Sequence, residues 1–227
     1  MSPKEKVTVV IPAKNEERGV GEVIQAVKQY ADEILVVDGH STDNTVKVAE
    51  SLGARIVFDN GKGKGDALRC AIKTAAGDVI VFIDADGSHD ANDIPKLITP
   101  ILLGKVDMMI GSRGTGGSDE LHGDINKLIR IAGSGIILVA INYRFNVRLT
   151  DSQNGFRAIR RFVALELDLK ENITTIEQEM LIKCLKKGYK VSEVPTHEYV
   201  RKYGDSNINL RKTSFRYVYS AIKYLYF

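Results

Sequence analysis

Short apolar runs alternate with amphipathic segments along the first 110 residues of the chain. The runs are rich in valine and isoleucine, which is typical of strands buried on both faces of a parallel sheet. They cover residues 7–11, 33–38, 54–58, 79–83 and 106–110. The segments between them have apolar residues at helical spacing and cover residues 16–30, 41–52, 65–75 and 94–103. This alternation predicts an α/β fold, in which helices flank a mostly parallel sheet.

The pattern changes after Gly111. Glycine dominates the next few positions, which indicates a mobile loop at 111–117. Beyond it we expect helices at 125–143 and 176–187, a strand on the sheet's edge at 155–160, a strand at 190–194 and an aromatic, basic helix at 213–227. The sequence contains no internal repeat, and a chain of 227 residues fits one α/β domain.

Two carboxylates follow the strand at 79–83 directly. Asp84 and Asp86 lie one residue apart, with Gly87, Ser88 and His89 after them. Ligands collect at the carboxyl ends of strands in open α/β sheets, and hard carboxylate oxygens suit Mg²⁺ or Mn²⁺. Strand-end aspartates also often cap the next helix, but Asp90 is better placed for that role. The spacing therefore favours a metal site that faces a diphosphate.

Polar residues also follow the first two strands. Pro12, Lys14 and Glu16 come after the first, and Asp38 ends the second, where an acidic residue commonly accepts hydrogen bonds from a nucleotide. The glycine-rich stretch 61–66 lacks the phosphate-loop spacing. It is either a flexible helix-capping loop or a segment that brings Lys64 or Asp66 to the nucleotide.

Four polar residues of the second half form a candidate anion site: Arg113, Arg130, Ser134 and Arg201. Arginine forks match phosphate geometry, but scattered arginines are usually solvated, and the spacing leaves both interpretations open.

Composition narrows the classes of partner. A net charge of +3 gives no reason to expect nucleic acid, and 44% hydrophobic with 27% charged residues is ordinary for a soluble protein.

Cys70 and Cys184 lack metal-ligand spacing, so we expect free thiols in a reducing compartment. Residues 1–6 lead straight into a strand, which predicts no signal peptide. The uncharged run 131–143 is shorter than the ~20 residues that a spanning helix needs.

Several motifs together resemble one known family. They are IPAKNEE at 11–17, VVDGHSTDNT at 36–45, GKGDAL at 63–68, VIVFIDADGSHD at 79–90, GSR at 111–113, DSQNGFRAIRR at 151–161, KKGYKVSEVP at 186–195 and RKYGDSNIN at 201–209. This order is similar to that of family 2 inverting glycosyltransferases of the GT-A fold. The later motifs most resemble the dolichyl/polyprenyl-phosphate hexosyltransferases.

The resemblance implies one GT-A domain over 1–227, with a nucleotide-sugar half at 1–110, an acceptor half at 111–210 and a membrane-interface helix at 211–227. It implies metal-dependent transfer of a hexose, mannose before glucose, to dolichyl or polyprenyl phosphate. The enzyme would lie peripherally on the cytoplasmic face of a membrane. A membrane-anchoring partner or a spanning segment beyond Phe227 would fit this placement.

The resemblance also implies residue roles. Those at the nucleotide sugar are Pro12, Lys14, Glu16, Asp38, Lys64, Asp84 and Ala85. Asp84, Asp86 and Ser88 would serve Mg²⁺ or Mn²⁺. Arg113, Arg130 and Ser134 would hold the acceptor phosphate, and Arg201 would reach the leaving diphosphate. Catalysis would thus rest on Asp86, Arg113, Arg130 and Arg201. Gly87-Ser88 and Gly39 depart from the usual motifs, so a UDP-hexose becomes a plausible donor beside a GDP-hexose.

The final helix has two interpretations. Tyr217, Ala221, Tyr224 and Leu225 share a helical face, and Lys212, Arg216 and Lys223 can reach lipid phosphates. The pattern fits an interfacial helix that presents this face to lipid, or a docking helix that buries its aromatic residues on the domain.

Three other functions fit parts of the sequence. A glycosyltransferase can use a UDP-sugar and a saccharide or another hydroxyl acceptor. The string Asp84-Ala85-Asp86-Gly87-Ser88 matches the nucleophile motif of haloacid-dehalogenase-like phosphatases, although that motif belongs on the first strand. An inactive membrane scaffold is the third, and the retained carboxylates and arginines argue against it.

Overall fold

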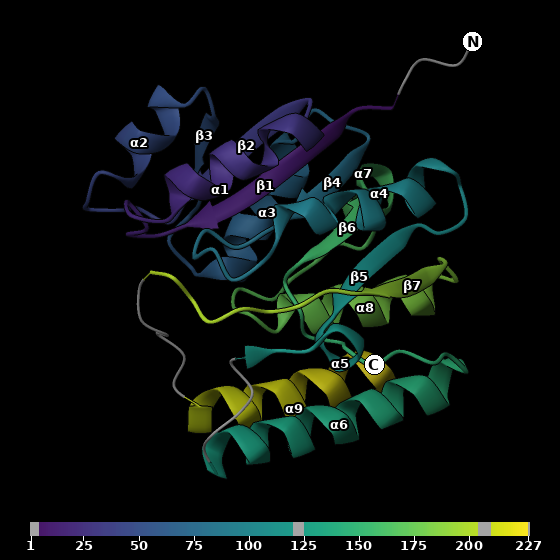
Figure 1. Cartoon of the computed structure of the whole chain (residues 1–227). Coiled ribbons are helices and arrows are strands. Elements are labelled where there is room, and N and C mark those ends of the chain that lie inside the picture. The colour runs from purple at the N-terminus through teal and green to yellow at the C-terminus, as the bar shows by residue number, and fades with distance from the viewer. Residues whose placement is uncertain (1–4, 120–124, 204–209, 227) are drawn as a thin grey trace.

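A seven-stranded sheet forms the centre of the molecule (Figure 1). The computed structural model describes residues 5–119, 125–203 and 210–226. The strands are β1 Val7–Ala13, β2 Glu33–Asp38, β3 Arg55–Phe58, β4 Val79–Phe82, β5 Met108–Ser112, β6 Arg157–Arg160 and β7 Val191–Pro195. Their order across the sheet is β3-β2-β1-β4-β6-β5-β7. The strands expected in the first half are therefore confirmed, with ends that shift by one or two residues.

The sheet is parallel except at β6. β3, β2, β1 and β4 pair in parallel, as do β5 and β7, while β6 runs antiparallel to both β4 and β5. The expectation that 155–160 forms an edge strand is wrong, because β6 lies between two strands. Arg157 of this inner strand is fully buried, and it donates to the carbonyl oxygens of Asn154 (2.9 Å) and Glu177 (2.7 Å).

Helices cover both faces of the sheet. They are α1 Val20–Val27, α2 Thr45–Ser51, α3 Lys64–Thr74, α4 Ile94–Leu102, α5 Arg113–Gly116, α6 Ile125–Phe145, α7 Arg161–Glu166, α8 Ile176–Lys186 and α9 Leu210–Tyr226, with short 3₁₀ turns at Lys28–Tyr30 and Ala91–Asp93. The buried residues form two hydrophobic cores, one on each face of the sheet. Helices α1, α2 and α4 contribute to one core, and α3, α6, α7, α8 and α9 contribute to the other. The fold is the predicted α/β arrangement, with the core in two layers.

The glycine-rich stretch after residue 110 is ordered, which corrects the expectation of a mobile loop. Gly111 and Ser112 belong to β5, and the Ser112 hydroxyl caps α5 by accepting a hydrogen bond from the Thr115 amide (3.3 Å). A Cβ atom at Gly111 would lie 2.6 Å from Thr196 Oγ1. The glycine is thus required by close packing of neighbouring strands.

Helices α6 and α9 lie side by side at one end of the molecule (Figure 1). Ala221, Tyr224 and Leu225 of α9 are buried in the core, and the Tyr217 hydroxyl donates to the Thr174 carbonyl (3.1 Å). The interpretation that this face of α9 meets lipid is therefore wrong, because it docks on the domain. Within the described residues, no helix is both long and apolar enough to cross a membrane.

The opposite faces of these two helices are exposed and apolar. We call them the outer helix faces, and they comprise Ile136, Val139 and Tyr143 of α6 with Phe215, Tyr219, Ile222 and Tyr226 of α9. Neither helix contains an acidic residue. Their basic residues are Lys127, Arg130, Arg144, Arg211, Lys212, Arg216 and Lys223.

Candidate active site

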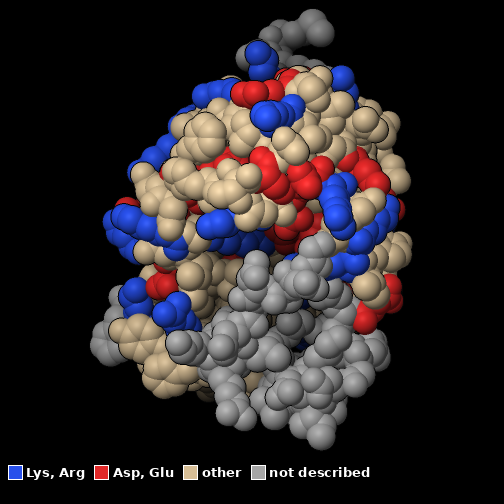
Figure 2. Space-filling view, turned by 90° about the vertical axis from the view of Figure 1, so that its left-hand side faces the viewer, with Lys and Arg blue, Asp and Glu red and all other residues tan. Residues whose placement is uncertain are grey.

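A cavity of about 320 Å³ opens where β1, β2 and β4 end. Figure 2 shows this face of the molecule, with acidic side chains gathered across its middle and basic side chains on both sides. Many of the predicted site residues line the cavity: Pro12, Lys14, Glu16, Lys64, Asp84, Ala85, Asp86 and Arg201. The structure thus brings together side chains from segments that span the chain from β1 to the region after β7.

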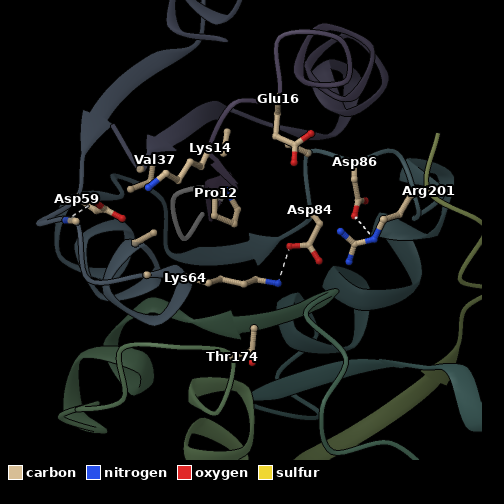
Figure 3. A pocket seen from close by; sticks show the side chains of 16 residues that line it. Pro12, Lys14, Glu16, Val37, Asp59, Lys64, Asp84, Asp86, Thr174 and Arg201 are labelled. Carbon is tan, nitrogen blue, oxygen red and sulfur yellow. Dashed lines mark hydrogen bonds and ion pairs between the residues drawn. The ribbon is translucent and has the colours of Figure 1, made fainter. Parts of the chain in front are cut away.

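Each carboxylate of the Asp84-Ala85-Asp86 segment has a basic partner (Figure 3). Lys64 Nζ lies 2.6 Å from Asp84 Oδ1, and Arg201 Nε lies 3.4 Å from Asp86 Oδ2. The other oxygen of Asp86 accepts hydrogen bonds from the Ser88 amide (3.0 Å) and hydroxyl (2.7 Å). Ser88 therefore orients Asp86 and does not itself line the cavity.

Lys64 also contacts a second acidic residue. Its Nζ atom lies 3.3 Å from Oε1 of Glu177, which begins the buried face of α8. Burial raises the pKa of Glu177, although Lys64 opposes the change. Burial also disfavours the charged forms of Asp84 and Lys64, but their attraction outweighs it, so the pKa of Asp84 is lowered and that of Lys64 is raised. Both groups of this pair are charged at neutral pH.

The pKa of Glu16 is raised in the cavity. Burial is the main cause that raises its pKa, and repulsion by Asp86 and Asp84 adds to it. Arg201 has the opposite influence. A further positive charge in the cavity would therefore favour the ionised form of Glu16.

Asp38 and Asp59, at the ends of two neighbouring strands, differ in whether they line the cavity. Asp38 is fully buried and does not line the cavity, because both its oxygens accept hydrogen bonds from Ser41 (2.8 and 2.6 Å). Asp59, directly after β3, does line it and accepts from the Gly61 amide (2.7 Å). Sequence reasoning missed Asp59, although an acidic residue after a predicted strand was a usable signal. Contact between Asp38 and a nucleotide stays a prediction.

The structure places the predicted arginines and Ser134 differently with respect to the cavity. Arg113 does not line the cavity: Nε and Nη2 donate to Asp151 (2.7 and 3.1 Å), and Nη1 lies 3.3 Å from Glu198. Ser134 is half-buried in α6. Arg130 also belongs to α6, but its side chain is outside the described residues. Among the described arginines of the prediction, Arg201 is the one that reaches the cavity.

The cavity offers a divalent cation only part of a coordination shell. Asp84 and Asp86 supply hard carboxylate oxygens on one wall, which suits Mg²⁺ or Mn²⁺. Over residues 5–119, 125–203 and 210–226, no three His, Cys, Asp or Glu side chains are grouped to hold a metal ion. The residues fit a cation whose remaining ligands come from phosphate oxygens and water, as Mg²⁺ usually binds.

Known proteins resemble this chain over most of its length. It is 34% identical to the glycosyltransferase AglJ of Haloferax volcanii over 92% of this chain and 68% of AglJ. It is 35% identical to a dolichol-phosphate mannosyltransferase of Pyrococcus furiosus over 94% of this chain and 62% of that protein. Both relatives are thus longer than the part that this chain spans.

The fold also occurs in a solved structure. Glucosyl-3-phosphoglycerate synthase of Mycobacterium tuberculosis, solved with Mn²⁺, UDP and glucosyl-3-phosphoglycerate, matches 97% of this chain and 80% of its own with a TM-score of 0.77 at 23% identity. This match establishes a GT-A-like fold. The model of the family described as glycosyl transferase family 2 matches residues 8–167. The chain therefore belongs to glycosyl transferase family 2.

Proposed function

We propose that the chain transfers a hexose, with inversion, from a nucleotide-diphosphate sugar to dolichyl or polyprenyl phosphate. The observation that carries this proposal is the cavity itself, where two carboxylates and two basic side chains face one another. Carboxylates suit a metal ion and the basic groups suit a diphosphate. Residues 1–110 would bind the donor and residues 111–210 the acceptor.

The donor is a UDP- or GDP-hexose. The structural neighbour was solved with UDP and Mn²⁺, which supports a UDP-sugar and a divalent metal. The pyrococcal relative is named as a mannosyltransferase, which supports mannose as the transferred sugar, with glucose next. Asp84 and Asp86 would hold Mg²⁺ or Mn²⁺, which would neutralise charge on the leaving diphosphate.

The side chains of the cavity would act mainly through charge and position. Lys64 and Arg201 would bind phosphate oxygens of the donor and stabilise the negative charge that develops on the departing diphosphate. Pro12, Lys14 and Glu16 would position the nucleotide. The acceptor phosphate is already ionised at pH 7, so its attack on the sugar needs no strong general base. Alignment of the two substrates would then supply much of the rate.

The outer helix faces support a lipid acceptor. The seven exposed apolar side chains of the outer helix faces are unusual for a surface in water, and the two helices carry basic residues without any acidic one. Such a combination suits the surface of an anionic bilayer. The chain would therefore meet the membrane peripherally through the face of α9 that points away from the domain.

A hydroxyl acceptor is the alternative, and Glu177 is the observation that favours it. Attack by a saccharide hydroxyl needs a general base, and a carboxylate with a raised pKa beside the cavity suits that task. However, Glu177 is only 1% exposed and does not line the cavity, which favours the phosphate acceptor. The phosphatase interpretation is excluded by the family.

The test is a transfer assay with two donors and two acceptors. UDP-glucose or GDP-mannose is supplied with Mn²⁺, and with either dolichyl phosphate or a free saccharide. We expect labelled sugar in the lipid extract, in a linkage of inverted anomeric configuration. Transfer to the saccharide alone would support the alternative, and hydrolysis without transfer to either acceptor would contradict both.

A further inference from the structure

The two carboxylates of the cavity are each paired with a basic side chain of the same protein. We propose that Lys64 and Arg201 are exchangeable counter-ions, which neutralise Asp84 and Asp86 until a metal ion and a nucleotide diphosphate bind together. The two basic groups then transfer from the carboxylates to the diphosphate. This exchange rests on the proposed function, and it makes the binding of metal and nucleotide strongly cooperative.

The Lys64–Asp84 pair is enclosed by backbone. A Cβ atom at Gly155 would lie 2.8 Å from Lys64 Nζ and 3.3 Å from Asp84 Oδ2, so the chain at residue 155 covers the pair closely. The backbone next to Lys64 is also fixed, because the Gly65 amide donates to the Asn172 carbonyl (2.9 Å). Partial burial strengthens the attraction between the ammonium and the carboxylate. A divalent cation that approaches Asp84 must therefore compete with Lys64.

Glu177 allows Lys64 to leave Asp84 without losing every partner. Its Oε1 atom lies 3.3 Å from Lys64 Nζ, and its Oε2 atom is buried without a hydrogen-bond partner among the described residues. When a metal ion takes the charge of Asp84, the ammonium group keeps a negative neighbour. The cost of an isolated buried charge is thus avoided.

The second pair is looser than the first. Arg201 Nε lies 3.4 Å from Asp86 Oδ2, beyond the ~2.7–2.9 Å that is usual for a charge-assisted hydrogen bond. The Arg201 side chain is 30% exposed, whereas that of Asp86 is 7% exposed. A partly exposed arginine can turn toward an incoming phosphate while Ser88 continues to hold Asp86 in place.

Because of the charges in the cavity, we expect either ligand alone to bind weakly. A metal ion alone meets Lys64 and Arg201, which already occupy the carboxylates. A diphosphate alone meets Asp84, Asp86 and Glu16, which repel it. Together the two ligands bring charges of opposite sign, and the phosphate oxygens complete a coordination shell that the described residues leave incomplete. The coupling is reciprocal, so each ligand tightens the other by the same factor.

The experiment measures Mn²⁺ binding from the electron paramagnetic resonance signal of the free ion. Wild-type protein is titrated alone, with saturating UDP or GDP, and with the matching monophosphate. Each nucleotide is also titrated without protein, so that the Mn²⁺ that it chelates itself can be subtracted. We expect either diphosphate to tighten Mn²⁺ binding about tenfold or more, within the usual range for coupled sites. The monophosphate, which lacks the second phosphoryl group, should have a much smaller effect.

Lys64→Met separates the exchange from simple joint coordination. Without the competing ammonium, this variant should bind Mn²⁺ alone about threefold or more tightly than wild type, while the coupling to the diphosphate shrinks. Lys62→Met is the matched control, because it removes the same charge from an exposed position of the same loop, outside the cavity. It should behave as wild type.

Two results would overturn the proposal. One is unchanged or weaker Mn²⁺ binding by folded Lys64→Met without nucleotide, and the other is full coupling in that variant. Should Lys64→Met not fold, Arg201→Met makes the same prediction through Asp86 at a more exposed position. Wild-type protein that binds Mn²⁺ but neither nucleotide would contradict the proposed function, and the metal-only comparison would still decide whether Lys64 competes for Asp84.

Discussion

The cavity and the outer helix faces are built in opposite ways. Around β4, charged side chains are partly or fully buried, whereas on α6 and α9 large apolar side chains are exposed. Each arrangement reverses the usual distribution of residues in a soluble protein. Buried charges that face a cavity indicate a charged ligand, and exposed apolar faces indicate an apolar one. The proposed substrates, a nucleotide-diphosphate sugar and a lipid phosphate, have these two characters.

Burial of charge alone does not identify a site, as a third region shows. Arg113 is half-buried against Asp151 and Glu198, with three of its nitrogen atoms engaged. This cluster joins three charged groups, but Arg113 does not line the cavity. We therefore propose that the Arg113 cluster stabilises the fold and that Lys64 and Arg201 bind ligand.

The largest effect is expected from Asp86→Asn. The amide still accepts hydrogen bonds from Ser88, but the charge that would hold the metal is lost. Transfer should fall about a hundredfold or more, on the scale of losing a group that stabilises transition-state charge. Asp90→Asn is the control, since Asp90 caps the next turn through the Asn92 amide and an asparagine can do the same. Comparable rates for the two variants in the transfer assay would contradict the metal assignment.

Two Arg→Lys variants separate ligand binding from stability. Arg201→Lys should lower transfer about tenfold at unchanged melting temperature, because an ammonium group cannot reproduce a bidentate fork. Arg113→Lys should lose hydrogen bonds to charged partners, at about 1.5–3 kcal/mol. Its melting temperature should fall by about 2–4 °C per kcal/mol. Calorimetry measures the melting temperature and initial rates measure transfer for both variants. A lower melting temperature for Arg201→Lys together with a lower transfer rate at unchanged melting temperature for Arg113→Lys would contradict our distinction.

A smaller effect is expected on membrane binding. The double variant Tyr219→Ser, Ile222→Ser removes apolar area from the outer helix face of α9, and each buried apolar side chain is worth at most about 1.5–3 kcal/mol. Flotation with vesicles of phosphatidylcholine and phosphatidylglycerol should show binding that is weaker by about tenfold. Phe162→Ser, Leu165→Ser is the matched control, because both residues are exposed on α7. Equal losses for the two double variants would argue against a specific face.

The smallest effect concerns pH. Despite burial, Arg113 holds the pKa of Asp151 below its ordinary value of 3.8. A carboxyl group whose pKa is lowered by folding stabilises the protein above its unfolded pKa, and this contribution is lost as the pH falls through the folded pKa. Urea unfolding at several pH values below about 5 should therefore show a shallower loss of stability for Asp151→Asn, by at most about 1.4 kcal/mol per pH unit. An identical slope would show that Asp151 does not contribute.

The strand that carries the central carboxylates could be predicted because its signal is local. Val79–Phe82 is an uninterrupted apolar run, and the sheet delivers Asp84 and Asp86 to its carboxyl edge, beside Pro12 and Glu16 from β1. The position of β6 could not be predicted, since the burial of Arg157 depends in part on the carbonyl oxygen of Glu177, which lies 20 residues later in the chain. The partners of Arg113 could not be predicted either, because they lie 38 and 85 residues away.

The faces of α9 illustrate a different limit. Tyrosines occur on both sides of this helix, so aromatic spacing alone cannot say which side docks. Tyr224 is buried and its hydroxyl donates to Glu171 (2.8 Å), whereas Tyr219 is exposed. The choice depends on a polar partner that lies 53 residues earlier in the chain.

A crystal structure with Mn²⁺ and a donor nucleotide, with the ion located by its anomalous scattering, tests the central claim most directly. We predict an anomalous peak within about 2.0–2.6 Å of oxygen atoms of Asp84, Asp86 and the diphosphate. Lys64 and Arg201 should lie against phosphate oxygens, no longer paired with the two carboxylates. A peak at another acidic cluster, or a nucleotide bound outside this cavity, would contradict the account.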